Sequence, residues 1–277
     1  MKALGDLFFS WVLPWIPKRL MSRAWGLMMR VPWPWPLRIP LNWLFAKAFS
    51  IDLSEAEKTP GQYSSFDDLF TRRLKPGLRP VEGDFVSPVD GALTEYGPVV
   101  DGQILQVKGW EYPLEEFLGS HALAKSYEGG SFATLYLCPA DYHRVHTPLT
   151  GNLVSALHIP GQLWPVNEWS VKNIQRLFCL NERVVLNFLG SKGPFSVVMV
   201  GATNVGKMSI YPDPSIVTNR WMWHAPTVRE YEPAIALKCG EELGAFHLGS
   251  TVVLVLGKGY PAVTRARGAI RLGHKLN

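Results

Sequence analysis

Along most of the chain, short runs of apolar and β-branched residues alternate with breaks rich in glycine and proline. Runs of this kind, bounded by turn residues, are typical of β-strands. The runs lie at Asp84 to Val100, Ile104 to Val107, Ser131 to Cys138, Leu153 to His158, Arg183 to Phe188, Phe195 to Val200 and Thr251 to Leu256. Because turns and only short helices join them, they predict an α+β fold with a mainly antiparallel β core over residues 51–277.

Helical periodicity is confined to the first quarter of the chain. Residues 18–30 predict a helix with one basic, polar face and one apolar face. The polar face holds Arg19, Ser22, Arg23, Gly26 and Arg30. A second apolar stripe at 41–49 follows the run VPWPWP, which is expected to be extended or turn-like. Residues 64–74 predict a short helix with a serine cap and aspartates in its first turn.

Positive charge is concentrated in the same N-terminal region. The chain has 28 basic and 23 acidic residues, and residues 1–50 hold seven of the basic side chains but one acid, Asp6. Six of the eleven tryptophans also lie there. Basic side chains interleaved with tryptophan favour the headgroup region of an anionic membrane. We therefore expect residues 1–50 to form amphipathic membrane-associating helices, although such stripes also pack on a protein's own core.

The N-terminal region is predicted to lie on the membrane and not to cross it. The longest uncharged stretch, Leu7 to Pro17, is broken by two prolines and is too short for a bilayer core of about 30 Å. Asp6 and the lack of a small-residue cleavage site argue against a signal peptide. The three cysteines are widely spaced, as in a protein with reduced thiols. Together these features predict a peripheral protein on the cytoplasmic face of the cell membrane, with no nucleic-acid partner.

Two dense polar clusters are candidates for chemistry. The first is DYHRVHTP at 141–148, in which two histidines stand three residues apart. No carboxylate or cysteine follows at a spacing typical of metal ligands, so no metal site is expected. Such a cluster inside an apolar domain is a better candidate for acid–base work. The second is KCGEELGAFHLGST at 238–251, which runs into an apolar strand and lacks the G-x-S-x-G elbow of α/β-hydrolases.

These clusters belong to a set of motifs that together resemble a known family. The motifs are SPVDG at 87–91, YHRVHTPLTG at 142–151, NERVV at 181–185, VGATNVG at 200–206 and GEELGAFHLGST at 240–251. In order and approximate spacing they are similar to those of the phosphatidylserine decarboxylases of the bacterial, proteobacterial type. Those are pyruvoyl enzymes that make phosphatidylethanolamine.

The resemblance implies that the chain cuts itself between Gly249 and Ser250. It implies that His146 is the base that activates the Ser250 hydroxyl, and that Asp90 orients this base. Ser250 then becomes a covalent pyruvoyl group, the pyruvate cofactor. The products are a β chain, 1–249, and an α chain, 250–277, which are expected to form a heterodimer that itself dimerises.

The expected turnover follows from the same resemblance. Loss of carbon dioxide from an amino acid leaves electrons on Cα, and no ordinary side chain accepts them, so a cofactor is required. The pyruvoyl group is expected to form a Schiff base with phosphatidylserine and to release phosphatidylethanolamine. His143 is the expected acid–base residue, and Tyr142 is expected to bind substrate beside it. Arg144 has either a functional role or a place in a structural ion pair.

Three other functions are compatible with parts of this pattern. Asp90, His146 and Ser250 are the residue types of a serine hydrolase triad facing a lipid. The N-terminal segment alone fits a non-catalytic peripheral membrane protein. A pyruvoyl decarboxylase for a soluble amino acid shares the chemistry, but the basic, tryptophan-rich segment argues against it.

Overall fold

The computed structural model describes residues 15, 17–107, 110–203, 207–220, 224–247 and 250–277. An eight-stranded sheet forms its centre, and every neighbouring pair in it is antiparallel. Its strands are, in spatial order, β10 (Thr227–Leu237), β6 (Gly151–Ile159), β7 (Arg183–Gly190), β8 (Gly193–Val200), β12 (Ser250–Leu256), β4 (Ser131–Leu137), β1 (Gly91–Pro98) and β13 (Gly268–Ile270). The predicted α+β fold with an antiparallel core is therefore confirmed.

Two smaller sheets complete the β structure. One has three strands in the order β5 (Arg144–His146), β11 (Glu242–Phe246) and β9 (Met208–Ile210), and the other pairs β2 (Gln103–Val107) with β3 (Trp110–Pro113). The sequence pattern did not predict β3, β5, β9, β10, β11 or β13. Most of these are only three to five residues long, and the longer β10 is largely exposed. Neither kind carries the sustained apolar run on which the strand predictions rested.

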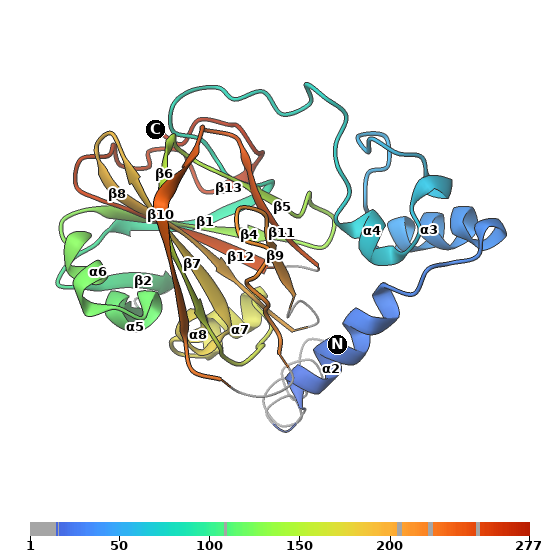
Figure 1. Ribbon diagram of the computed structural model, residues 1–277, viewed down its shortest axis with the longest axis horizontal. Helices are drawn as coiled ribbons and strands as arrows, with labels where there is room; N and C mark the ends of the chain where they lie inside the picture. The colour runs from blue at the N-terminus through green and yellow to red at the C-terminus, as the bar shows by residue number, and fades with distance from the viewer. Residues whose placement is uncertain (1–14, 16, 108–109, 204–206, 221–223, 248–249) are drawn as a thin grey trace.

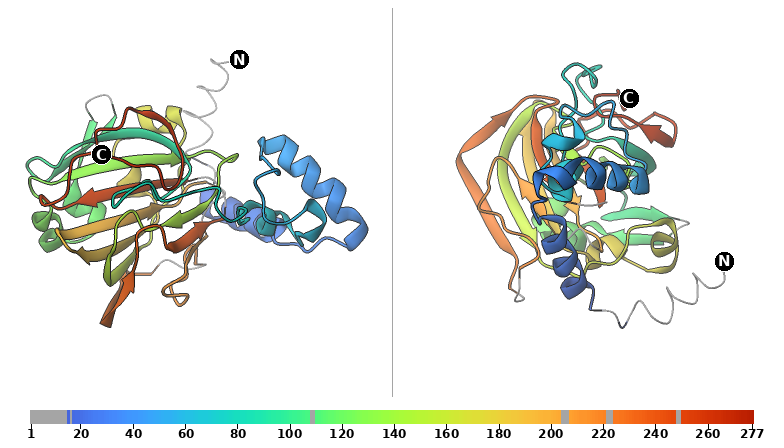
Figure 2. Two further views of the ribbon diagram at one scale, coloured as in Figure 1. Left: turned by 90° about the horizontal axis from the view of Figure 1, so that it is seen from above. Right: turned by 90° about the vertical axis from the view of Figure 1, so that its right-hand side faces the viewer.

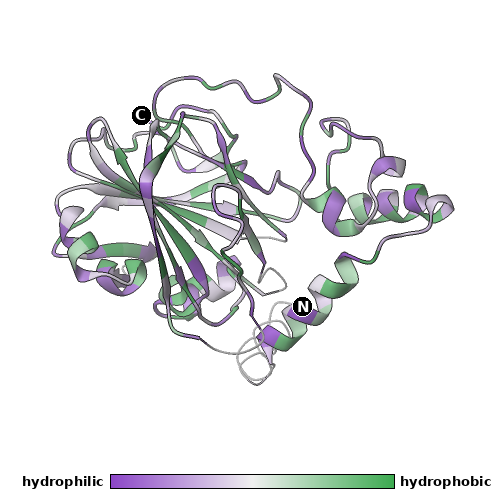
Figure 3. Cartoon of the chain, viewed as in Figure 1, coloured by the Kyte–Doolittle hydropathy of each residue, from purple (hydrophilic) through white to green (hydrophobic). Residues whose placement is uncertain are grey.

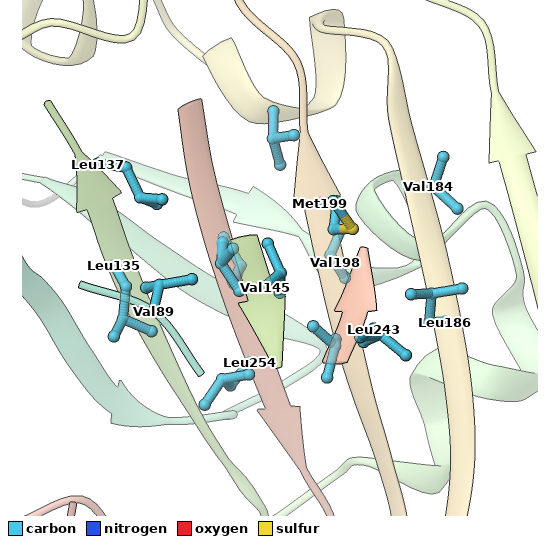
Figure 4. Packing of buried hydrophobic residues seen from close by; sticks show 14 of the residues in the cluster. Val89, Leu135, Leu137, Val145, Val184, Leu186, Val198, Met199, Leu243 and Leu254 are labelled. Carbon is cyan, nitrogen blue, oxygen red and sulfur yellow. The ribbon is translucent and has the colours of Figure 1, made fainter. Parts of the chain in front are cut away.

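The core lies between the large sheet and the three-stranded sheet. All seven residues of β12 are buried, and β8 is buried along its last six residues. Figure 4 shows Val145 of β5 and Leu243 of β11 against Val198 and Met199 of β8. Fully burying side chains of this size stabilises the fold by about 1.5–3 kcal/mol each. The smaller sheet, which carries part of the YHRVH motif, is thereby fixed over the middle of the larger one.

Helices α2 (Lys18–Met29), α3 (Trp35–Phe49) and α4 (Phe66–Phe70) lie together at one side of the β body (Figure 1; Figure 2). The short helices α5 (Leu114–Leu118), α6 (His121–Ser126), α7 (Glu168–Asn173) and α8 (Leu177–Leu180) lie on the β body itself. A 3₁₀ turn, η3 (Pro60–Gln62), precedes α4.

Two helix predictions require correction at their boundaries. The run VPWPWP is not extended throughout, because Trp35 and Pro36 already form the first turn of α3. Proline is tolerated there, since the first-turn amides have no partner within the helix. The helix expected at 64–74 is shorter, although Ser65 caps it as expected by accepting a hydrogen bond from the Asp68 amide.

Helix α2 presents some of its apolar residues outward. Leu20 and Leu27 are 54% and 69% exposed, whereas Met29 and, on the polar face, Ser22 are buried. In α3, Trp35 and Trp43 are likewise 73% and 54% exposed. Figure 3 shows hydrophobic and hydrophilic residues alternating along both helices and a mainly hydrophobic colouring in the inner strands. No helix in the described part of the chain has the length and apolar character needed to cross a bilayer.

Candidate active site

Asp90 and Ser250 are brought to one end of the large sheet by three neighbouring strands. Ser250 is the first residue of β12 and pairs with Leu137, the last residue of β4. Asp90 immediately precedes β1, the strand on the other side of β4. Neighbouring strands lie about 4.8 Å apart, so the backbones at Asp90 and Ser250 are about 10 Å apart. Residues 160 positions apart in the sequence are thus neighbours in the fold.

Gly91 of the SPVDG motif allows this close arrangement. Its φ is +153°, and a Cβ atom at this position would lie 2.2 Å from the carbonyl oxygen of Tyr136 on β4. Only glycine permits that approach without moving the backbone. Gly91 therefore lets the chain that carries Asp90 run directly against the end of β4.

The second motif enters the site on the loop after β4 and on strand β5. The His143 carbonyl accepts a hydrogen bond from the Phe246 amide at 2.9 Å, and the His146 amide donates to the Pro88 carbonyl at 2.9 Å. The first bond attaches His143 to the segment that leads into residues 248–251. The second attaches His146 to the segment that carries Asp90. Gly249 lies outside the described residues.

The Asp90 carboxylate is held by partners that the sequence did not indicate. Arg79 donates to both of its oxygens, with distances of 2.6 to 3.1 Å, and the Leu272 amide donates to Oδ1 at 2.8 Å. These hydrogen bonds to Asp90 raise the pKa of the Arg79 guanidinium. Glu55 binds the same guanidinium at 2.6 Å. Asp90 is thus an ionised carboxylate fixed between Arg79 and the C-terminal segment.

The His146 ring has two partners, and neither is Asp90. Its Nδ1 lies 2.8 Å from the Gly240 carbonyl oxygen, and its Nε2 lies 3.2 Å from the Tyr142 hydroxyl. Burial lowers the pKa of His146, while the Gly240 carbonyl and the nearby charge of Asp90 act to raise it. Burial also raises the pKa of Tyr142, so the phenol keeps its proton and donates it to Nε2. In this structure, Asp90 acts on His146 through its charge and not through a hydrogen bond.

His143 is completely buried and neutral. Its ring packs on Phe70 with centroids 4.1 Å apart, and Nδ1 lies 2.9 Å from the Asp141 carbonyl oxygen. Burial lowers the pKa of His143 to about 3, since the charged ring would have to leave water. Because Nδ1 carries the proton, Nε2 has a free lone pair, and this buried atom has no hydrogen-bond partner in the part of the chain that the structure describes.

The Ser250 hydroxyl is another buried polar atom without a partner. The residue is 0% exposed, and its Oγ makes no hydrogen bond among the described residues. Buried polar groups are nearly always paired, so unpaired ones mark sites of chemistry or of a missing group. The unpaired Ser250 Oγ fits a site where residue 250 is modified.

Arg144 proves to be part of an ion pair. Its guanidinium binds the Glu242 carboxylate on β11, and its Nε donates to the Thr71 carbonyl at 2.8 Å. Of its two possible roles, the structural ion pair is the one that the contacts support. The pair fastens β5 to β11 and to the end of α4.

A hollow of about 360 Å³ opens beside Asp90 and Tyr142. Its walls combine acidic residues with Arg72, Arg79 and Arg271, so the charges in it are largely balanced.

Nothing in the sequence indicated that three groups would bind Asp90 or His146. These groups belong to Arg79, Gly240 and Leu272. Arg79 stands in an ordinary turn-like run, and the other two act through backbone atoms.

Known proteins resemble this chain over most of its length. The family model described as phosphatidylserine decarboxylase matches residues 66–276. The chain is similar to a phosphatidylserine decarboxylase proenzyme of Anaeromyxobacter sp. (strain K), with 44% identity over 92% of each chain. It is 42% identical to the proenzyme of Myxococcus xanthus, over 91% of this chain and 90% of the other. The proenzyme of Shewanella loihica is also 42% identical, over 88% and 87% respectively. The chain therefore belongs to the phosphatidylserine decarboxylase family.

Proposed function

We propose that this chain is a phosphatidylserine decarboxylase proenzyme that cuts itself between Gly249 and Ser250 and converts phosphatidylserine to phosphatidylethanolamine. The observation that carries the proposal is the buried, unpartnered Ser250 hydroxyl at the start of β12. It lies at the sheet end that also holds Asp90 and the YHRVH motif. Family membership supports the reaction, and the position of Asp90 and Ser250 at one end of the large sheet supports the proposed residues.

Self-cleavage begins at the Ser250 hydroxyl. Oγ attacks the Gly249 carbonyl carbon, its proton passes to a base, and the C–N bond breaks as an ester forms. Loss of the Ser250 α-proton then expels the Gly249 carboxylate and leaves a dehydroalanine. Addition of water to this residue releases ammonia and leaves the pyruvoyl group. His146 is the base in this proposal, and the Tyr142 hydroxyl and Gly240 carbonyl orient its ring.

Asp90 serves the same step through electrostatics. Its charge lies close enough to favour the protonated form of His146, and Arg79 and Leu272 keep it in place. A fixed anion beside a base stabilises the charge that the base acquires when it takes a proton.

The pyruvoyl group at position 250 supplies a carbonyl that accepts the electrons left when carbon dioxide departs. His143 is the proposed acid–base residue of that step. Its Nε2 is unprotonated in the free protein, so it must acquire the proton that it later delivers. An anionic substrate favours this uptake, because a nearby negative charge raises the pKa of an imidazole. Tyr142, which lines the adjoining hollow, is proposed to bind substrate there.

The cut leaves two chains in one fold. The α chain, 250–277, would keep β12 between β4 and β8 and β13 beside β1. The β chain, 1–249, would hold all the other strands. A non-covalent heterodimer of the two chains is the proposed mature form, and a dimer of these heterodimers is the proposed assembly.

The N-terminal helices are the proposed membrane-docking surface. Their outward-facing tryptophan and leucine side chains and their basic residues suit an anionic headgroup region. A diacyl lipid does not readily leave the bilayer, because each methylene moved into water costs about 0.8 kcal/mol. The proposed location is therefore the cytoplasmic face of the cell membrane, with the protein bound peripherally.

Intact mass spectrometry tests self-cleavage. We expect two chains, divided before residue 250, and a smaller chain with a blocked N-terminus. Ser250→Ala should give one uncut, inactive chain, and His146→Ala should leave most of the chain uncut. His143→Ala should still cut itself but release no carbon dioxide from phosphatidylserine. A single active chain that resists carbonyl-trapping reagents would support a serine hydrolase instead.

Vesicle binding tests the docking surface. The triple substitution Trp35→Ser, Trp43→Ser and Leu44→Ser should weaken sedimentation with phosphatidylserine vesicles at least tenfold while leaving self-cleavage unchanged. Val228→Ser is the matched control, because Val228 is 56% exposed but lies on β10 of the large sheet. Equal binding by the triple variant and the control would refute docking through α3.

A further inference from the structure

A second group of catalytic residue types is made up of residues other than Asp90, His146 and Ser250. The Ser209 hydroxyl on β9 lies 2.8 Å from His247 Nε2. The other ring nitrogen, Nδ1, lies 2.6 Å from a carboxylate oxygen of Asp67 on α4. A serine, a histidine and an aspartate linked in this order have the geometry of a hydrolase triad, which is recognised by its contacts and not by its order in the sequence.

The pKa of Asp67 suits the role. Burial raises the pKa of Asp67, but the hydrogen bond and charge of His247 and the nearby Arg30 and Lys207 outweigh it and hold the pKa below its ordinary value. An ionised Asp67 can hold His247 Nδ1 by a hydrogen bond. This contact turns Nε2 toward Ser209, where a general base must lie.

The three residues line a cavity of about 820 Å³ between α2 and the β9 region. That volume lies within the range of sites for small organic ligands, about 300–1,000 Å³. Its walls are largely apolar and include Leu20, Leu27, Met208, Ile216 and Val217. Four cationic side chains also line it: Arg23, Arg30, Lys207 and Arg220. An apolar chamber with cationic side chains favours an amphiphile with an acyl chain and an anionic group.

We propose that Asp67, His247 and Ser209 form a second catalytic site, one that hydrolyses carboxylic esters of acyl chains bound in this cavity. Ser209 Oγ attacks the ester carbonyl carbon while its proton moves to His247 Nε2. The alcohol leaves with that proton, and the acyl group remains on Ser209. A water molecule, deprotonated by the same ring, then attacks the acyl-serine, releases the fatty acid and restores the hydroxyl. Lys207 and Arg30 supply positive charge for the developing oxyanion.

The proposed hydrolysis does not use the pyruvoyl group, so it is tested in a variant that cannot form this group. The full chain carrying Ser250→Ala is treated with a fluorophosphonate probe, and the adduct is located by peptide mass spectrometry. We expect a single labelled serine, Ser209. In this background His247→Gln and Asp67→Asn should each slow labelling at least about a hundredfold, the usual contribution of a general base.

Ser215→Ala is the matched control. Ser215 lies near the same cavity and its hydroxyl donates to Asp213 at 2.6 Å, but no imidazole links the two. This variant should be labelled at Ser209 at the parental rate. Hydrolysis of p-nitrophenyl esters should depend on Ser209 in the same way, with kcat/KM rising as the acyl chain lengthens.

The alternative is that the three side chains only tie β9 and the segment after β11 to α4. In that case Ser209 would stay unlabelled in the parent, the Ser250→Ala chain. The His247→Gln and Asp67→Asn variants would still melt at a lower temperature than this parent. Such a result overturns the proposal, as does labelling that is equally fast without His247. If one variant fails to fold, the labelling of Ser209 in the parent and the remaining variant decides the question.

Discussion

The neutrality of His143 predicts a pH dependence of stability that one substitution should remove. The buried ring stays uncharged in the folded protein down to about pH 3, whereas in the unfolded chain it takes up a proton near its ordinary pKa of 6.5. Between these values the unfolded state binds more protons, so stability falls as the pH falls. His143→Asn keeps a donor for the Asp141 carbonyl but has no titrating group.

The magnitude follows from the two pKa values. Each pH unit below the unfolded value costs about 1.4 kcal/mol once the unfolded ring is charged. Between about pH 7.5 and about pH 5, His143 should therefore lower the free energy of unfolding by about 2 kcal/mol. The pKa of the buried His146 ring is also lowered, so His146 makes both proteins less stable as the pH falls. Because this loss of stability is common to the protein with His143 and to the His143→Asn variant, it cancels when the two are compared.

Urea denaturation followed by tryptophan fluorescence measures the effect. Both proteins carry Ser250→Ala, so that one intact chain unfolds and refolds. His143→Asn is expected to be less stable at every pH, and only the slope with pH is compared. For each protein we compare the loss of unfolding free energy between the two pH values. If the losses in the parent and in His143→Asn differ by less than about 0.5 kcal/mol, the assignment of a neutral, fully buried His143 is refuted.

Three further substitutions test the packing around the site. Arg79→Met leaves the buried Asp90 carboxylate without its charged partner and should lower the free energy of unfolding by about 3 kcal/mol or more, measured in urea. Gly91→Ala places a Cβ atom 2.2 Å from the Tyr136 carbonyl oxygen and should lower the melting temperature or prevent folding; an unchanged melting temperature would contradict this contact. Leu254→Ala removes a fully buried side chain from β12 and should cost about 2–5 kcal/mol in the same denaturation assay.

The sequence predicted those parts of the fold that have a strong local signal. Strands such as β8 and β12 carry uninterrupted apolar runs because both of their faces are covered, and such runs are visible without a structure. Strands β5 and β9 are three residues each and owe their extended form to pairing with β11. Their stability is a tertiary effect, so no local pattern marks them.

In the candidate site, too, some features could be predicted from the sequence and others depend on the fold. Motif resemblance drew attention to Asp90, His146 and Ser250, and the strand order explains why Asp90 and Ser250 lie at the same end of the large sheet. The hydrogen-bond partners of Asp90 and His146 come from elsewhere in the chain, as when the Gly240 carbonyl, 94 residues away, accepts from His146. Only the folded backbone places such atoms, which is why the resemblance names His146 but not the groups that bind its ring.

The central position of β12 has a consequence for the life of the protein. Before cleavage, the sheet can assemble from a single polypeptide, and the pairing of β12 with β4 and β8 is an intramolecular event. If the chain is cut before Ser250 as proposed, the same strand belongs to a 28-residue fragment, and refolding of the denatured enzyme becomes a bimolecular reaction that depends on concentration. The intact precursor can therefore refold as a single chain. A cleaved molecule that unfolds and loses its fragment must first bind that fragment again from solution.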